Sequence, residues 1–396
     1  MLRDVSKIQQ TLDEWDLDGW LLYDFHKSNP IASEVLKISN AIITRRWFYW
    51  IPREGVPIKL VHSIEAEYFE DLKGRNCVYT GWQELNAHLE GILTGSKKVA
   101  MEYSPKGAIP YISRVDSGTI ELVRSFGVEV VSSADLVQLF QSKWDEKALE
   151  LHQKTVPLMY ELKDGAFKLI AEKVNEGNAI SEYQVQQWIY EGYQKHNLHT
   201  EDPPIVAVNE HSGQPHFTPT RETTKVIRQG DLVLIDMWAK LDDPKATYVD
   251  ITWTGFVGEE VPERYTQIFD IVAKARDTGV QIIRDRWDAG NEIAGWEVDN
   301  AARAVIEDAG YGKFFTHRTG HSLDTSPHGN GVNIDNLETQ DRRKIIPGMA
   351  FTIEPGIYLS EFGIRSEINV YASENGPVIT TSPVQDHIIP LLAMED

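Results

Sequence analysis

The sequence predicts an α/β protein of two domains, and three observations support this. The chain has 396 residues, more than one compact core usually holds. Short apolar runs typical of strands alternate with amphipathic stretches typical of helices. After Trp144 the short mixed elements give way to a long stretch of helical periodicity. We therefore expect a smaller α/β domain over residues 1–144 and a second domain over residues 145–396.

The first domain is expected to contain a mixed sheet flanked by helices. Residues 19–23 form an apolar run typical of a buried strand. The runs at 47–50 and 58–61 flank a turn-forming segment that contains Gly55, so together they predict a hairpin. Further strands are expected at 99–101 and 128–131, and helices at 82–93 and 111–126.

The second domain is expected to begin with two helices. Apolar residues recur at helical spacing over about two dozen residues after Asp145. A second helix is expected from Ser181, because Ser181 and Gln184 have the spacing of a capping box. Strands are then expected around 205–208, 232–238, 248–256, 350–353 and 363–371, and helices at 263–286 and 296–309.

Composition excludes several classes of protein. The 60 acidic and 39 basic side chains give a net charge of −21, which argues against binding to nucleic acid or to an anionic membrane. Cys77 is the only cysteine, which excludes an intrachain disulfide and favours a reducing compartment. No apolar run approaches the roughly 20 residues of a membrane helix, and the first residues lack the apolar core of a signal peptide. We therefore expect a cytoplasmic protein.

Four carboxylates of the second domain stand in apolar, strand-like segments. Asp236 and Asp250 interrupt two expected strands, Glu354 ends a third, and Glu367 lies in a fourth. Buried carboxylates take up protons or require a cation, and several together also repel one another. A bound divalent metal ion resolves both problems.

Histidines of the same domain supply the nitrogen ligands that such a site would use. His317, His321 and His328 fall within twelve residues, and His211 and His216 precede the strand of Asp236. Oxygen and nitrogen ligands without thiolate suit manganese, cobalt, iron or zinc, and the number of carboxylates suggests two ions.

These residues, in this order, resemble the pita-bread metallopeptidases, which include methionine aminopeptidase, aminopeptidase P, prolidase and the metal-free relative creatinase. The resemblance rests on Asp236 and on four local motifs: Asp-Ile-Thr at Asp250, Gly-His-Ser-Leu at His321, Thr-Ile-Glu-Pro-Gly-Ile-Tyr at Glu354 and Gly-Ile-Arg-Ser-Glu at Glu367. It covers most of residues 150–396 and implies an α+β pita-bread catalytic domain. The residues before it resemble the creatinase-type N-terminal domain of the proline-specific branch.

The resemblance implies five metal ligands: Asp236 on one ion, His321 and Glu354 on the other, and Asp250 and Glu367 bridging both. It also implies catalytic roles. Glu354 would act as general base as well as ligand, while His216 and His328 would bind the scissile carbonyl or the developing oxyanion. Arg365, with Tyr358, would orient ligating carboxylates by hydrogen bonding.

Other residues stay open between two interpretations. His317 and His211 either support the ligands or are structural. Thr252 is expected to bond a ligand carboxylate, although strand propensity also explains a threonine there. Trp47 and Trp50 are expected in core packing or a dimer contact.

The predicted function is a dinuclear exopeptidase that hydrolyses Xaa-Pro bonds in short peptides, most directly an Xaa-Pro dipeptidase with manganese. An aminopeptidase P-like Xaa-Pro aminopeptidase remains an alternative, since the two activities differ in whether a wall of the cleft blocks peptides that extend past proline. A non-peptide amide hydrolase is another, because Asp324, Gly329 and the long separation of Asp236 from Asp250 depart from the family pattern around the cleft. A non-catalytic binding module would be expected to lack ligands, whereas all five are present. A homodimer is expected, in which the N-terminal domain of one subunit helps to wall its partner's cleft.

Overall fold

The computed structural model describes residues 5–38 and 42–394. The chain divides into two compact units, Met1–Ser142 and Lys143–Asp396, here called the N-terminal unit and the C-terminal unit. The sequence placed this boundary after residue 144. No helix in the described ranges is long and apolar enough to cross a membrane.

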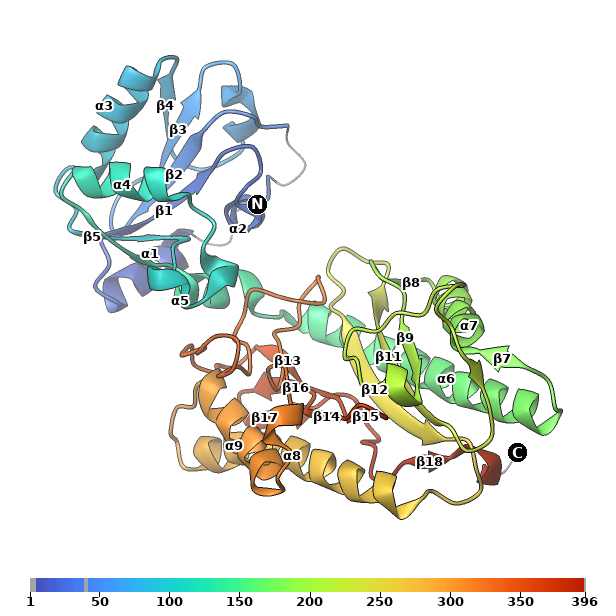
Figure 1. Cartoon of the computed structure of the whole chain (residues 1–396). Coiled ribbons are helices and arrows are strands. Elements are labelled where there is room, and N and C mark those ends of the chain that lie inside the picture. Colours follow the sequence, from blue (N-terminus) through green and yellow to red (C-terminus); the bar gives the residue numbers. More distant parts are fainter. Residues whose placement is uncertain (1–4, 39–41, 395–396) are drawn as a thin grey trace. The chain divides into compact units, whose positions relative to one another are not determined.

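The N-terminal unit is a six-stranded mixed sheet with helices on both faces (Figure 1). Its strands, in the order β4-β3-β2-β1-β5-β6, are β4 (Arg75–Tyr79), β3 (Ile58–His62), β2 (Trp47–Pro52), β1 (Gly19–Asp24), β5 (Lys98–Met101) and β6 (Glu129–Ser132). Its helices are α1 (Val5–Glu14), α2 (Pro30–Leu36), α3 (Trp82–Leu93), α4 (Ser117–Ser125) and α5 (Ala134–Val137). The predicted hairpin is confirmed, because β2 and β3 pair antiparallel.

Alternation along β1 shows why this sheet is covered on both faces. Trp20 and Leu22 pack in one hydrophobic cluster, and Leu21 and Tyr23 pack in another. The tryptophans of β2 are also divided between the two faces. Trp47 packs in the cluster of Trp20, Trp50 packs in the cluster of Leu21, and their side chains are only 1% and 4% exposed.

The expected helix at 111–126 is wrong in its first turns. Pro110–Ile112 form a 3₁₀ turn, and α4 begins only at Ser117. Asp116 fixes this start, because its carboxylate accepts a hydrogen bond from the Thr119 amide at 2.9 Å.

The C-terminal unit begins with two helices that cover one face of a sheet (Figure 1). They are α6 (Glu146–Asn175) and α7 (Glu182–Lys195). The predicted capping box is confirmed, since the Gln184 amide and the Ser181 hydroxyl bond at 3.3 Å and the Gln184 side chain accepts from the Ser181 amide at 2.9 Å. The sheet contains β8 (Leu198–His199), β9 (Ile205–Val208), β11 (Leu232–Leu241), β12 (Val249–Phe256) and β18 (Ile389–Pro390); a separate pair is β7 (Ile180–Ser181) with β10 (Val226–Ile227).

The second half of this unit adds two long helices and two small sheets. The helices are α8 (Glu263–Asp288) and α9 (Gly295–Asp308). The sheets are β13 (Ala350–Ile353) with β16 (Ile368–Ser373) and β17 (Gly376–Ile379), and the hairpin of β14 (Gly356–Tyr358) with β15 (Gly363–Arg365).

The single strand expected over 363–371 is therefore two strands. The chain changes partner at Ser366 and Glu367, because β15 pairs with β14 whereas β16 pairs with β13. The Ser366 hydroxyl accepts a hydrogen bond from Arg276 of α8 at 2.6 Å, which ties the break to the long helix.

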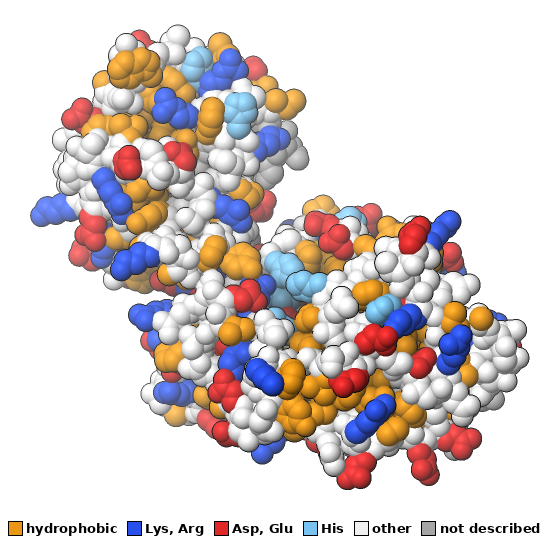
Figure 2. Space-filling view, in the orientation of Figure 1, with side chains coloured by type: hydrophobic (Ala, Val, Ile, Leu, Met, Phe, Trp, Pro, Cys, Tyr) orange, Lys and Arg blue, Asp and Glu red, His pale blue; other side chains and the backbone are white. Residues whose placement is uncertain are grey.

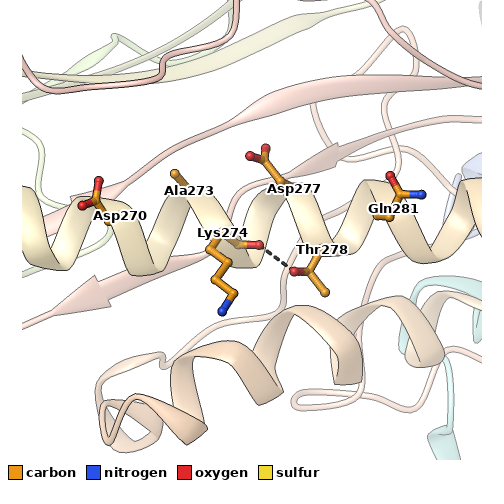
Figure 3. Close-up of a pocket in the computed structure, with 6 residues that line it drawn as sticks. All are labelled: Asp270, Ala273, Lys274, Asp277, Thr278 and Gln281. Carbon is orange, nitrogen blue, oxygen red and sulfur yellow. Dashed lines mark hydrogen bonds between the residues drawn. The ribbon is translucent and has the colours of Figure 1, made fainter.

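A shallow depression runs along α8 and is not the predicted site (Figure 3). All its lining residues come from this one helix: Asp270, Ala273, Lys274, Asp277, Thr278 and Gln281. Inside it the Thr278 hydroxyl donates to the Lys274 carbonyl at 2.7 Å, a bond within the helix itself.

Candidate metal centre

Two paired strands present the first two carboxylates. In the antiparallel register of β11 and β12, Asp236 lies opposite Thr252, and Trp238 lies opposite Asp250. The two neighbours of Asp236 on β11, Ile235 and Met237, point the other way into the core under α6 and α7. An aspartate can therefore interrupt an apolar run, because both faces of this strand are covered and only one of them carries the site.

The other ligands come from the second half of the unit. Glu354 follows β13 directly, and Glu367 stands at the change of partner before β16. His321 is docked beside β13 by two hydrogen bonds to Thr352: its carbonyl accepts from the Thr352 amide at 2.9 Å, and its amide donates to the Thr352 hydroxyl at 2.9 Å.

These groups converge in one buried cluster. The His321 Nε2 atom lies 3.5 Å from Asp250 Oδ2 and 3.4 Å from Glu354 Oε1. Asp250, His321 and Glu367 each offer a ligand atom, and all three atoms lie within 4.8 Å of one another. Asp236 joins the cluster through Arg365, whose guanidinium bonds its Oδ2 atom.

The donor set fits a divalent metal ion. Asp236 Oδ1 and Glu367 Oε1 are buried, and within the described part of the chain they have no hydrogen-bond partner. Burial raises the pKa of Asp250 and of Glu367 well above the usual range, and the charges of neighbouring carboxylates add to the effect. A bound cation supplies the missing partners of these oxygens and offsets the repulsion.

Arg365 and Thr252 fix the orientation of two ligands. Besides Asp236, Arg365 donates through Nε to the Thr252 hydroxyl at 3.0 Å and through Nη1 to the Tyr358 hydroxyl at 2.9 Å. The Thr252 hydroxyl in turn donates to Glu367 Oε2 at 2.7 Å. One guanidinium thus links Asp236 of β11 directly, and Glu367 through Thr252.

The structure places His317 in this same network rather than among the ligands. Its Nδ1 atom lies 2.7 Å from the Arg318 carbonyl, and its Nε2 atom lies 2.7 Å from the Tyr358 hydroxyl. Because a carbonyl only accepts, the ring proton is on Nδ1, and Tyr358 donates to Nε2. Burial, with the charge of Arg365, lowers the pKa of His317 to about 3, which agrees with a neutral ring.

The remaining histidines lie at different distances from the cluster. The ring centroid of His328 is 4.5 Å from that of His321, and the charge of His321, followed by burial, lowers the pKa of His328 to about 3. His216 is exposed, and its charge lowers the pKa of both His317 and His328. His211 instead bonds Glu182 at 2.8 Å and stacks on Phe217. Histidine side chains gather on the visible face of the C-terminal unit (Figure 2).

Sequence reasoning missed two residues that hold the cluster. The Asn369 amide group bonds both the amide and the carbonyl of Asp250, at 3.0 and 2.6 Å. The Thr352 hydroxyl, which accepts from the His321 amide, donates to Glu354 Oε1 at 3.1 Å. Each stands two positions from a ligand in the sequence, and this spacing is a signal that could have found them.

The chain is similar to known proteins. A family model described as metallopeptidase family M24 matches residues 159–374. The putative dipeptidase YkvY of Bacillus subtilis is 30% identical over 267 residues, which cover 66% of this chain and 67% of the relative. The Xaa-Pro dipeptidase of Pyrococcus horikoshii is 29% identical over 389 residues, 95% of this chain and 96% of the relative.

The fold is also that of solved structures. The prolidase of Thermococcus sibiricus superposes with a TM-score of 0.66 at 22% identity and covers 98% of both chains. The expected α/β class and pita-bread fold are confirmed by this likeness over nearly the whole chain. The family match, which spans more than half of the chain and contains all five expected ligands, shows that the chain belongs to metallopeptidase family M24.

Proposed function

We propose that the protein is a metal-dependent exopeptidase that hydrolyses Xaa-Pro bonds in short peptides, most directly in Xaa-Pro dipeptides. The observation that carries this proposal is the cluster of Asp250, His321, Glu354 and Glu367, in which Glu367 Oε1 is buried and has no hydrogen-bond partner among the residues that the structure describes. The name of the Pyrococcus horikoshii relative, which matches almost the full chain, supports the choice of substrate.

Five residues would hold two divalent ions: Asp236, Asp250, His321, Glu354 and Glu367. Bound ions of this kind polarise the scissile carbonyl and make water a nucleophile near neutral pH. We propose manganese, because four carboxylates outnumber one imidazole and no thiolate is present.

The chain's own side chains supply orientation and proton transfer. Glu354 is the proposed general base, since its carboxylate lies beside His321 and is oriented by the Thr352 hydroxyl. His328 is neutral and adjacent to His321, so it can donate a hydrogen bond to the carbonyl oxygen of the substrate as negative charge develops. His216, which is exposed nearby, is proposed to bind the same peptide.

A peptide digest tests this function. Metal-free protein is reloaded with manganese, cobalt or zinc and given Ala-Pro, Leu-Pro, Ala-Pro-Ala and Ala-Ala. We expect proline release from the two Xaa-Pro dipeptides, and its loss in Asp250→Asn but not in the control Asp308→Asn, which changes an exposed aspartate of α9.

The other outcomes separate the alternatives. Faster cleavage of Ala-Pro-Ala than of Ala-Pro would identify an Xaa-Pro aminopeptidase. Failure to release proline from any peptide with any of these metals would reject the proposed activity and leave an amide of another kind as the substrate class.

We further propose that the protein works in the cytoplasm as a homodimer. The single cysteine, Cys77, supports a reducing compartment. Large exposed apolar side chains on the N-terminal unit support a subunit contact, among them Trp82 at 62% exposure, whereas the buried Trp47 and Trp50 give no such support. Light scattering of the purified protein tests the dimer, and a monomer at working concentration would reject it.

A further inference from the structure

One aromatic side chain of the metal-binding sheet has no part in holding the ligands. Trp238 lies two residues after Asp236 on β11, on the same face of the sheet, and directly opposite Asp250 on β12. It is half-buried, whereas its neighbours Met237 and Ala239 are fully buried on the other face. A large ring thus stands next to two expected metal ligands with part of its surface open.

Trp238 joins two apolar clusters that flank the metal centre. On one side it packs, together with Phe217, against the cluster of Ile205, Ala207 and Leu234. On the other side it packs against a second cluster: Trp144, Ala148, Tyr248, Leu323 and Ala350. The residues of both clusters are buried, whereas Trp238 and Phe217 are half-buried. These two rings are therefore the open part of the apolar packing, and Phe217 directly follows the proposed catalytic His216 in the chain.

Polar contacts behind this surface hold it in place. The ring of Phe217 stacks on His211 with centroids 3.9 Å apart, and His211 bonds Glu182 at 2.8 Å. Glu182 is itself fixed by the amides of Val208 at 2.8 Å and Lys225 at 2.7 Å. An apolar surface held in this way is preorganised for binding, because its side chains lose little freedom when a ligand arrives.

We infer that Trp238, with Phe217 beside it, forms the wall that receives the side chain of the residue before proline and selects a bulky apolar residue there. This inference rests on the proposed function. The reacting bond must lie at Asp236 and Asp250, so a side chain within one residue of that bond reaches the neighbouring Trp238 ring. On this face two carboxylates, Asp236 and Asp250, stand against the one guanidinium of Arg365, so we assign the amino-terminal residue to this side and the carboxylate of proline to the other.

The substitution Trp238→Ala tests the inference with manganese-loaded protein and four dipeptides: Gly-Pro, Ala-Pro, Leu-Pro and Phe-Pro. We expect kcat/KM for Leu-Pro and Phe-Pro, relative to Gly-Pro, to fall about tenfold or more, since losing the wall of an apolar pocket costs on this scale. Trp238→Phe should keep most of the preference, and both variants should bind as much manganese as the wild type. The matched control is Trp287→Ala, which removes a half-buried tryptophan of α8.

Three results would overturn the inference. An equal loss of kcat/KM for all four dipeptides would place the ring against the proline or the reacting bond. An unchanged preference would give the ring no part in selection, and a loss of bound metal would make Trp238 a structural support of the ligands.

Calorimetric binding of free leucine and glycine to the same proteins separates this inference from the proposed function. If the wild type cleaves no Xaa-Pro peptide, the proposed function fails, while a leucine affinity at least about tenfold weaker in Trp238→Ala, with glycine unaffected, still supports the wall. Equal leucine binding by both proteins would reject it.

Discussion

The hydroxyl of Thr252 links two charged groups of the metal centre. It accepts from Arg365 and donates to Glu367, so both partners depend on its one oxygen atom. Groups that orient ligands in this way commonly change metal affinity by about 10- to 100-fold when removed. The orientation of the carboxylates, and not only their presence, therefore determines how tightly the site binds metal.

We predict that Thr252→Val, which keeps the side-chain shape, lowers manganese affinity about 10- to 100-fold because Glu367 loses its donor. Competition with a chelator measures this affinity. The control is Thr254→Val, two residues along the same strand, where the hydroxyl makes only a long 3.5 Å contact with the Arg365 carbonyl. Equal affinities for the wild type and Thr252→Val would show that this hydroxyl does not orient the ligand.

A second prediction concerns the pH dependence of the metal-free protein. Burial, followed by the charge of Asp250, raises the pKa of Glu367 above its ordinary value of 4.5. The folded state therefore holds this proton to a higher pH than the unfolded state does. The stability that this group contributes is complete below about pH 4.5 and is lost as pH rises through the raised pKa.

Accordingly, metal-free Glu367→Gln should melt at a higher temperature than the metal-free wild type at pH 8, with little difference at pH 4. Thermal unfolding followed by circular dichroism measures both. The order should reverse when manganese is added, because the variant lacks a ligand. A pH-independent difference between the two metal-free proteins would contradict the prediction.

At the scale of elements, close approach of backbones determines where His321 lies. A Cβ atom on Gly320 would stand 2.0 Å from the Thr352 carbonyl oxygen, so only glycine allows this segment to dock on β13. The backbone bond from the Thr352 amide to the His321 carbonyl depends on the same approach.

We predict that Gly320→Ala separates this segment from β13 and abolishes binding of the second metal ion, while most of the fold remains. Metal analysis and circular dichroism together check this. Gly91→Ala is the control, since a Cβ at Gly91 in α3 meets open space. Two tightly bound ions in Gly320→Ala would contradict the prediction.

Asn369 connects two sheets at the metal centre. Its side chain bonds the amide and the carbonyl of Asp250, so it ties β16 to β12. We predict that Asn369→Ala lowers the free energy of unfolding by about 1–3 kcal/mol, the usual cost of leaving buried polar groups unpaired. Urea unfolding measures it, with the exposed Asn375→Ala as control. An effect no larger than that of the control would show that the tie does not stabilise the fold.

Elements with strong local signals could be predicted from the sequence, and those set by distant partners could not. The capping box at Ser181 and the hairpin of β2 and β3 depend on nearby residues, so the sequence indicated them correctly. The break at Ser366 depends on pairing with β13 and β14, which lie earlier in the chain, so apolar pattern alone predicted one strand. The site follows the same division: each ligand stands in its own local motif, whereas the hydrogen bonds of His317 with Tyr358 and of Asn369 with Asp250 appear only when strands meet.

At the scale of the whole molecule, the two units have separate hydrophobic cores. Clusters around β1 belong to the N-terminal unit, and those around α6 and α8 belong to the C-terminal unit. All five expected metal ligands lie in the C-terminal unit. Calorimetric unfolding should therefore show one transition that manganese moves to a higher temperature and another that it leaves in place. One transition that moves as a whole would show instead that the units unfold together.

The most direct test of the account is the number of metal ions bound per chain, followed together with proline release from Ala-Pro. Metal-free protein is titrated with manganese, and the bound metal is measured by mass spectrometry at each step. We predict that binding saturates at two ions per chain, that activity rises to its maximum as the second ion binds, and that Asp250→Asn binds neither ion tightly. Protein that binds no manganese even when the metal is in excess would contradict the account. So would protein that binds two ions and releases no proline.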